Sequence, residues 1–422
     1  MRFTHSEHPG RAVRLAYCLN LHAAETLADL HQGLSLITLP LRDRLARPGE
    51  SFGVGMYLAG ALVREHPAGS RGIEELGEFL VRERLDPFTF NAFPYGGFAA
   101  AGLKERVFEP TWTERKRFEY TREVARIAAQ LNPEPTPDAH VSISTHTGSF
   151  GPHSIPTAEL QTAYSELGSE FSKIEREHGP RIVLALEPEP GSNLGDTAEL
   201  SGFFRDWSGE VRHDDDGPWG GPLSRRDFER HYGVCLDACH SAVEFEDPHA
   251  ALELVRRCSA FGKLQYTSAL AMPAPRDNAA GLAQLLALDE PRYLHQVRGS
   301  GADELLRARD LPELARFLRN PSSRERWLEC EELRCHFHVP VDAEELGSGL
   351  RTTRGHAEAL LDGLLERPSR WKSPELHVEI ETYTWDVLPG AARGPGSLVE
   401  GLEREYRHVI GRLEARGWAR SG

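Results

Sequence analysis

The sequence predicts a parallel (β/α)8 barrel with an insertion, and three observations lead to this fold class. Short apolar runs rich in β-branched and aromatic residues alternate with longer amphipathic stretches along almost the whole chain. The chain has 422 residues, which suits one barrel with inserted segments. Hydrophobic residues make up 40% of it, so it can bury a sizeable core. We therefore expect a single barrel domain over residues 1–422.

The first four strand segments are short runs in which apolar residues dominate. They are "VRLAYCLN" (13–20), "FGVGMYL" (52–58), "PFTFNAF" (87–93) and "HVSISTH" (140–146). The glycines of 52–58 weaken that strand, because glycine is depleted in strand interiors.

Five further segments read as strands, which makes nine where a barrel needs eight. They are "RIVLALEPE" (181–189), "YGVCLDA" (232–238), "GKLQYTS" (262–268), "LRCHFHVPV" (333–341) and "LHVEIETYTW" (376–385). Besides the doubtful 52–58, one of 262–268 and 333–341 is a candidate for the extra strand.

Helical periodicity fills the intervals between the strands. Residues 115–131 and 157–177 have apolar side chains near helical spacing. Residues 272–330 are expected to form a long, largely helical insertion. The acidic, Gly/Pro-rich stretch 214–222 is expected to be an exposed loop.

Charge and cysteine usage exclude several protein classes. The net charge of −15 disfavours a nucleic-acid partner, which requires phosphates to be neutralised. None of the six cysteines forms a C-x-x-C pair, and the C-x₃-C of Cys235 and Cys239 is a weak zinc signal. The chain has neither an apolar signal-peptide core nor an apolar run of about 18 residues. We therefore expect a cytoplasmic protein that does not span a membrane.

Polar residues recur where the predicted strands end, which is where barrel enzymes carry their chemistry. Glu187 and Asp237 each end an apolar run, and His240 follows Asp237. Gln265 lies in the next strand, and Glu381 lies near the end of the last one. Taken singly, Glu187 is equally consistent with a salt bridge, but the repetition is not expected by chance.

A divalent metal would resolve the cost of gathering these carboxylates. Ionised carboxylates inside a barrel are costly unless a cation or a hydrogen-bond network compensates them. Asp, Glu and His supply the oxygen and nitrogen ligands that such a cation accepts. Segment 333–341 also carries His336 and His338, which share one face of the strand. The sequence leaves open whether Gln265 or His338 completes the site.

This pattern resembles the xylose-isomerase-like TIM barrels, which include sugar isomerases, sugar epimerases and type IV apurinic endonucleases. The similar features are a Glu ending strand five, Asp-x-x-His at strand six, a polar ligand at strand seven and a Glu at strand eight. The resemblance implies a Mn²⁺, Mg²⁺ or Zn²⁺ site made of Glu187, Asp237, Glu381 and one of Gln265 and His338. The family usually has His at strand seven, so Gln265 would be a departure.

A closer resemblance is to the bacterial EboE family, metabolite-traffic proteins of the same superfamily. The motifs "AYCLNLH", "FTFNAFPYGGF", "SISTHTGSFG", "LEPEPGS", "YLHQV", "HFHVP" and "VEIETYTWDVLP" carry it over residues 16–389. The resemblance implies a barrel with a role in secondary metabolism and leaves the reaction undefined.

The first functional hypothesis is a metal-dependent isomerase or epimerase acting on a sugar-like or secondary-metabolite small molecule. The ion would chelate adjacent substrate oxygens and acidify the neighbouring carbon. By resemblance to the epimerases, Glu187 and Glu381 would flank the substrate as the catalytic carboxylates. The expected substrate-binding residues are Asn91, Tyr95, His146, His240 and His295.

Two alternatives remain at the level of sequence. "HTGS" (146–149) and "LHQVRGSG" (294–301) are similar to motifs of the apurinic-endonuclease branch, which favours a metal-dependent phosphoesterase or endonuclease-like hydrolase. The second alternative is a non-catalytic barrel that binds a hydrophobic or prenylated metabolite and passes it to a membrane-protein partner. Aromatic residues near the barrel mouth would suit it. The sequence does not define the oligomeric state.

Overall fold

A computed structural model describes most of the chain. The described residues are 1–98, 100–133, 138–152, 154–210, 223–258, 260–301, 304–388 and 394–421. The predicted loop 214–222 lies outside them.

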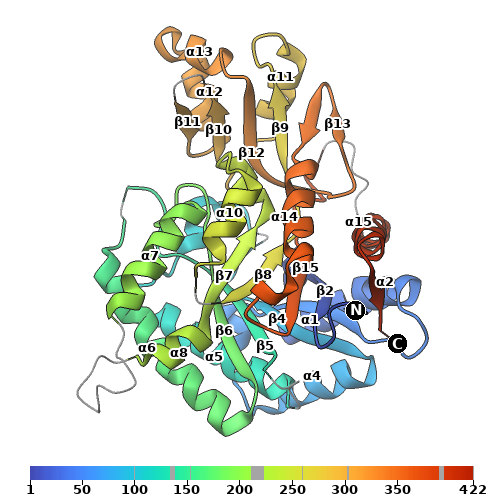
Figure 1. The fold of residues 1–422 in the computed structure, drawn as a ribbon. Coiled ribbons are helices and arrows are strands. Elements are labelled where there is room, and N and C mark those ends of the chain that lie inside the picture. Colours follow the sequence, from blue (N-terminus) through green and yellow to red (C-terminus); the bar gives the residue numbers. More distant parts are fainter. Residues whose placement is uncertain are drawn as a thin grey trace.

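Eight parallel strands close into a barrel, which confirms the predicted fold class (Figure 1). Their order is β15-β8-β7-β6-β5-β4-β3-β2, and β15 pairs with β2 to complete the ring. Two short antiparallel strands, β1 (Arg2–His5) and β16 (Trp418–Arg420), extend the sheet beside β2. The barrel strands are β2 (Ala12–Cys18), β3 (Phe52–Tyr57), β4 (Leu85–Asn91), β5 (His140–His146), β6 (Arg181–Glu187), β7 (Tyr232–Asp237), β8 (Phe261–Gln265) and β15 (Glu375–Ile380).

The doubtful segment 52–58 is a barrel strand, and its glycines have a steric purpose. A Cβ at Gly55 would lie 1.7 Å from Oε1 of Glu379, and one at Gly53 would lie 2.3 Å from the carbonyl oxygen of Leu15. The strand therefore needs glycine where the barrel interior is crowded. The extra strand is 333–341, which belongs to a different sheet.

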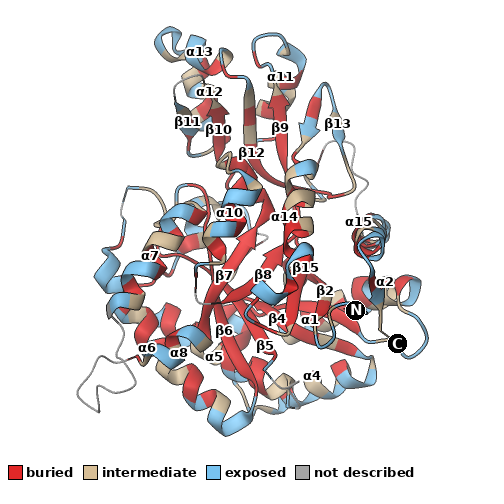
Figure 2. Cartoon of the chain, in the orientation of Figure 1, coloured by how far each residue is buried: buried red, intermediate tan, exposed pale blue. Residues whose placement is uncertain are grey.

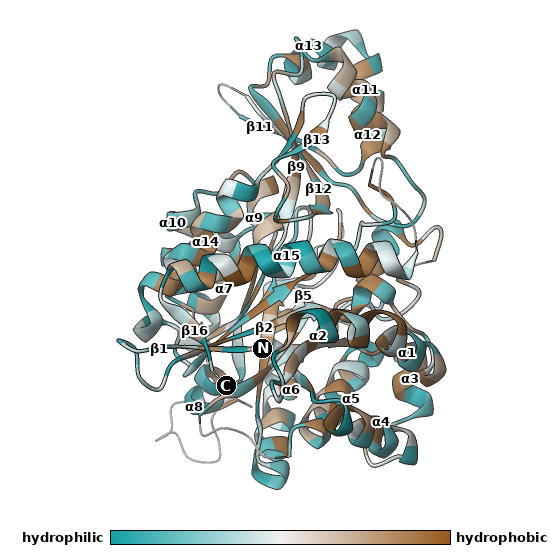
Figure 3. Cartoon of the chain, turned by 90° about the vertical axis from the view of Figure 1, so that its right-hand side faces the viewer, coloured by the Kyte–Doolittle hydropathy of each residue, from teal (hydrophilic) through white to brown (hydrophobic). Residues whose placement is uncertain are grey.

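Helices cover the outside of the barrel and bury one face each. In α15, buried residues such as Leu402, Tyr406, Val409 and Leu413 recur every three or four positions. Figure 3 shows apolar and polar residues alternating along this helix, and Figure 2 shows buried strands inside a partly exposed helical layer. The helices are α1 (Leu27–Gly33), α2 (Leu39–Leu45), α3 (Gly60–Glu65), α4 (Arg71–Arg82), α5 (Arg115–Leu131), α6 (Thr157–His178), α7 (Thr197–Glu210), α8 (Arg225–His231), α9 (Ala238–Val243), α10 (Pro248–Val255), α14 (Arg354–Glu366) and α15 (Pro395–Ala415).

A second sheet lies above the barrel (Figure 1). Its strands come from the part of the sequence between β8 and α14. Its six antiparallel strands follow the order β11-β10-β12-β9-β14-β13. They are β9 (Ser268–Pro273), β10 (Val297–Ser300), β11 (Leu305–Ala308), β12 (Glu332–Val339), β13 (Glu345–Gly347) and β14 (Leu350–Thr352), and the helices beside them are α11 (Ala279–Ala287), α12 (Leu311–Arg319) and α13 (Pro321–Leu328).

The insertion therefore differs from the largely helical segment expected at 272–330. It contains three helices, but it also contains a sheet, and it extends to β14. It has its own hydrophobic core, which includes Leu270, Val297, Leu314, Trp327 and Phe337. Segment 333–341, predicted as a strand, is β12 of this sheet. The other strands are short and pair mainly with strands distant in the sequence, so local patterns did not reveal them.

In the part of the chain that the structure describes, no helix has the length and apolar character needed to cross a membrane.

Candidate metal centre

Three carboxylates predicted as metal ligands meet at the C-terminal end of the barrel. Glu187 is the last residue of β6, Asp237 is the last of β7, and Glu381 directly follows β15. One oxygen from each lies within 4.8 Å of the others, and all three side chains are buried. The parallel strands deliver them to the same edge, as the sequence pattern predicts.

The three buried acids repel one another electrostatically. Burial, followed by the charges of Glu381 and Asp237, raises the pKa of Glu187 well above its ordinary value. Burial, followed by Glu379 and Asp237, does the same to the pKa of Glu381. Oε2 of Glu187 and Oδ2 of Asp237 are buried without a hydrogen-bond partner. Such atoms call for a proton donor or a cation.

Neighbouring groups fix the positions of two of these acids. The side-chain amides of Asn20 and Asn91 both donate to Oε1 of Glu381, at 2.5 and 2.8 Å. Asp237 caps the N-terminus of α9, where Oδ1 accepts the backbone N–H of His240 at 2.8 Å. The Asp-x-x-His spacing therefore sets an acid and a histidine side by side.

Three histidines converge on the same place, and each is held through Nδ1. His240 donates from Nδ1 to the carbonyl oxygen of Pro188 at 2.9 Å. His338 donates from Nδ1 to the carbonyl oxygen of Glu381 at 2.9 Å. His336 donates from Nδ1 to Oε1 of Gln296 at 2.5 Å. In a neutral imidazole, a protonated Nδ1 leaves Nε2 as a bare acceptor.

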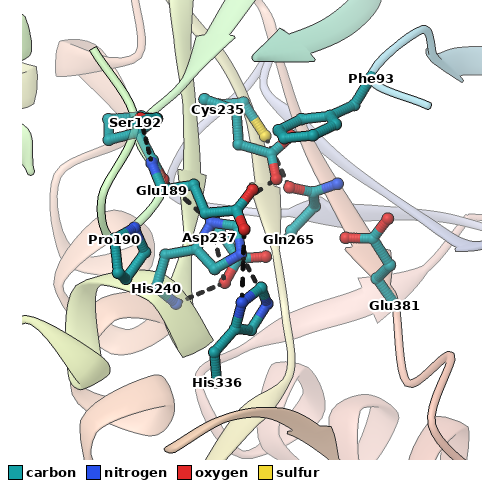
Figure 4. Close-up of polar contacts among 12 residues, drawn as sticks. Phe93, Glu189, Pro190, Ser192, Cys235, Asp237, His240, Gln265, His336 and Glu381 are labelled. Carbon is teal, nitrogen blue, oxygen red and sulfur yellow. Dashed lines mark hydrogen bonds and ion pairs between the residues drawn. The ribbon is translucent and has the colours of Figure 1, made fainter. Parts of the chain in front are cut away.

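The tautomer of His336 is fixed by a chain of polar contacts. The amide nitrogen of Gln296 donates to Oε1 of Glu189 at 2.7 Å and to the carbonyl oxygen of Pro190 at 3.0 Å. The other end of that amide is therefore an acceptor, and it must receive the Nδ1 proton of His336. Figure 4 shows Glu189 and His336 facing each other beside Asp237.

The three Nε2 atoms consequently point at one another. Nε2 of His336 lies 3.1 Å from Nε2 of His240 and 3.0 Å from Nε2 of His338. Burial lowers the pKa of His336 well below its ordinary value and that of His338 to about 4. Among the described residues, the hydroxyl of Tyr383 is the one donor that reaches this point, at 3.1 Å from Nε2 of His336. Facing lone pairs repel unless a cation lies between them, so the donor set fits a divalent transition metal.

The two alternatives for the remaining ligand, His338 and Gln265, lie in different surroundings. Nε2 of His338 lies 3.9 Å from Oδ2 of Asp237. Gln265 is fully buried, and its Oε1 accepts the thiol of Cys235 at 2.9 Å. His338 therefore faces the acids from the insertion, whereas the carbonyl end of Gln265 is already occupied.

Two of the five predicted substrate-binding residues, Asn91 and His240, line the pocket above the acids. Tyr95, His146 and His295 are not part of that lining. Tyr95 hydrogen-bonds Arg64. Nδ1 of His146 accepts the backbone N–H of Gly148 at 3.3 Å, and Nδ1 of His295 donates to the carbonyl oxygen of His336 at 2.9 Å. The latter two support loops and strands around the site.

Three pocket residues were not among the predicted site residues: Asn20, Glu189 and His336. Signals for them existed. Glu189 follows Glu187 by two residues, and His336 shares a strand face with His338. What local pattern could not provide was the position of β12 over the barrel mouth, which brings both histidines to the acids.

No protein-family model matches the chain, and no curated protein does. Solved structures resemble it at low identity. A structure of the IolI protein with a bound zinc atom has a TM-score of 0.46 at 10% identity and covers 96% of this chain and 99% of that one.

Two further structures resemble the chain to a similar degree. A xylose isomerase domain protein from Planctomyces limnophilus has a TM-score of 0.46 at 12% identity, covering 96% of both chains. A D-psicose 3-epimerase in the presence of D-fructose has a TM-score of 0.45 at 9% identity, covering 95% of this chain and 99% of that one. The barrel assignment rests on the closed strand order, and these similarities add nothing to it about function.

Proposed function

We propose that this protein is a divalent-metal-dependent enzyme of the isomerase or epimerase type, acting on a sugar-like or secondary-metabolite small molecule. The observation that carries the proposal is the convergence of three histidine Nε2 atoms beside two unpartnered carboxylate oxygens. A pure binding site for an organic molecule has no need of such an arrangement, because gathering these groups is costly unless a cation or proton donors compensate them.

The residues that would hold the ion are Glu187, Asp237, Glu381 and His338, with His240 and His336 adjoining them. When bound, a divalent ion polarises substrate oxygens and acidifies the adjacent C–H group. Gln296 would act by fixing the tautomer of His336, as partners beyond the ligands commonly do.

Glu187 and Glu381 would remove the proton from the acidified C–H group of the substrate and return it. Burial raises the pKa of both carboxyl groups well above the ordinary value, so they hold a proton more readily than exposed acids do. Asn20 and Asn91 hold Oε1 of Glu381, so the second oxygen of that carboxylate is left to face the pocket. Water would be excluded by the apolar residues that surround the pocket opening.

The resemblance to the EboE family adds the cellular context to this proposal. Several of its motifs supply residues around the centre: Asn91 and Phe93, Glu187 and Glu189, His336 and His338, and Glu381 and Tyr383. On this basis the substrate would be a secondary metabolite, and export through a membrane-protein partner would follow the reaction.

The three histidines favour a second candidate, a metal-dependent hydrolase. Imidazole-rich sites bind metals that lower the pKa of a coordinated water and produce a nucleophile. The two candidates differ in the bond that changes, a C–H bond in one and an ester bond in the other.

The first test is the metal content of the purified protein by elemental mass spectrometry. We expect near-stoichiometric metal in the wild type and its loss in Asp237→Ala and Glu381→Ala. Glu246→Gln is the matched control, because Glu246 is bound to Thr197 away from the centre. No metal in the wild type, even after incubation with Mn²⁺, Mg²⁺ or Zn²⁺, would overturn the proposal.

A second assay separates the two candidates. Deuterium exchange at carbons beside hydroxyl or carbonyl groups, followed by NMR, is expected for an isomerase or epimerase. Metal-dependent hydrolysis of a nitrophenyl phosphate ester without such exchange would favour the hydrolase instead.

A further inference from the structure

The pocket above the metal centre combines a polar floor with apolar walls. Its floor is made by Asn20, Asn91, Glu187, Glu189, His240, His336, His338 and Glu381. Its walls include five side chains that we call the apolar collar: Phe93, Phe98, Tyr293, Leu294 and Tyr383. Substrate oxygens would therefore meet the floor, while the rest of the molecule would lie against carbon.

The aromatic part of the collar is mutually packed. The rings of Phe98, Tyr293 and Tyr383 lie with centroids 4.9 to 5.3 Å apart, in tilted and edge-to-face arrangements. Phe93 and Leu294 belong to a second apolar cluster that also contains Phe108. Rings in such contacts offer both edges and faces to a further aromatic group.

Backbone hydrogen bonds hold the two sides of the collar together. Gly102 donates to the carbonyl oxygen of Pro291 at 2.6 Å, and Lys104 donates to that of Arg292 at 2.9 Å. These bonds join the loop after β4 to the insertion just before Tyr293. The collar is thus preformed, which lowers the entropy cost of binding.

The charged residues at the pocket already have partners. Nζ of Lys104 lies 3.2 Å from Asp289 and 3.0 Å from Asp310. Arg292 is paired with Glu290 at 3.2 Å and with Asp386 at 2.7 Å. Among the wall residues that the structure describes, no cation is therefore without an ion-pair partner for a phosphate or carboxylate group to take.

A free sugar fits this distribution poorly. It carries a hydroxyl on nearly every carbon, and hydroxyls left against the collar would lose their hydrogen bonds to water. Polar recognition is thus concentrated at the metal centre, and the collar adds only the hydroxyls of Tyr293 and Tyr383.

We infer that the substrate is an amphiphile with two adjacent oxygens on its head, a diol or hydroxy-ketone, joined to a planar aromatic body. This inference rests on the proposed function, since the metal centre receives the head. The collar receives the aromatic body.

Isothermal titration calorimetry of the Mn²⁺-loaded protein tests the inference with three probes: 1-phenyl-1,2-ethanediol, glycerol and D-fructose. The phenyl diol should bind about 30-fold more tightly than glycerol, as expected for burying a phenyl ring. D-fructose should bind no better than glycerol.

Substitutions in the apolar collar test whether its residues cause the tighter binding of the phenyl diol. Phe98→Ala should lower affinity for the phenyl diol about tenfold, leaving glycerol binding and metal content unchanged. Leu294→Ala is a second variant, in case the loss of Phe98 disturbs the fold. Phe317→Ala is the matched control, because Phe317 stacks on Trp327 within the insertion, outside the pocket lining.

The outcomes separate this inference from the proposed function. Absence of metal in the same sample refutes the proposed function, while a phenyl preference in metal-free protein would still support the collar. Tighter or equal binding of D-fructose by metal-loaded protein overturns the inference alone. Binding of none of the probes overturns it as well.

Discussion

Replacing Glu187 by Gln should change protein stability in opposite directions with and without metal. In the metal-free protein, Glu187 crowds two other buried carboxylates, and its Oε2 has no partner. The closest basic atom, Nδ1 of His240, lies 3.7 Å from Oε1 and is already bonded to Pro188. Gln has the same shape without the charge, so the substitution removes repulsion and breaks no strong contact.

The expected magnitude follows from the geometry. Two unit charges no more than 4.8 Å apart repel by at least about 3.5 kcal/mol at an effective dielectric constant of 20. Protonation of one acid caps the cost, so we expect a gain of about 2–3 kcal/mol. For a chain of 422 residues this corresponds to a melting temperature about 3 °C higher. With Mn²⁺ at about 1,000 times its dissociation constant, the wild type gains about 4 kcal/mol, and the variant gains far less.

Thermal unfolding in EDTA and in Mn²⁺ measures both states. Glu187→Gln should melt above the wild type in EDTA and below it in Mn²⁺. Glu375→Gln is the matched control, because Glu375 is paired with Arg14 at 3.1 Å at the opposite end of the barrel. That variant should be less stable than the wild type in both conditions. If Glu187→Gln melts below the wild type in EDTA, the three acids do not repel as described.

Three further substitutions test other parts of the structure. Gln296→Leu frees the tautomer of His336 and should weaken metal binding about 10–100-fold by competition titration, with circular dichroism unchanged; unaltered affinity would contradict the role of the amide. Gly55→Ala places a Cβ 1.7 Å from Oε1 of Glu379 and should lower the free energy of unfolding by about 3 kcal/mol in urea titration. An unchanged free energy would show that the side chain of Glu379 can move aside. Burial raises the pKa of Glu246 to about 7, so its ionisation destabilises the fold increasingly as pH rises from about 4.5 to 7. Glu246→Gln should therefore be more stable than the wild type by about 1–3 kcal/mol at pH 8 but not at pH 4, and an equal difference at both values would be inconsistent with that titration.

The barrel and its acids could be predicted because both depend on local pattern. A buried parallel strand is a short apolar run, and a carboxylate at its end is conspicuous, as with Glu187 and Asp237. The same reasoning counted against 52–58, because Gly55 looks like a strand-weakening residue in the sequence, although Glu379 on the nearby strand β15 requires it.

The position of the histidines could not be predicted from local sequence pattern. His336 and His338 lie on a strand that the sequence suggested, yet its sheet is built from pairings between distant segments, β12 with β9 and β10. Nothing local places that sheet above β7. Tyr95 shows the converse, because a tyrosine in a glycine-rich loop suits a substrate contact, although here it bonds Arg64 at the surface.

The insertion has its own core, yet its strand β12 supplies two of the three histidines at the barrel mouth. A metal ion bound there would therefore connect the barrel to the insertion, which have separate hydrophobic cores. Transient lifting of the second sheet would take His336 and His338 away from the acids, so the rate of metal release would follow the rate of that opening. Amide hydrogen exchange along β12 would slow when the ion is bound, whereas the strands at the far end of the barrel would exchange as before.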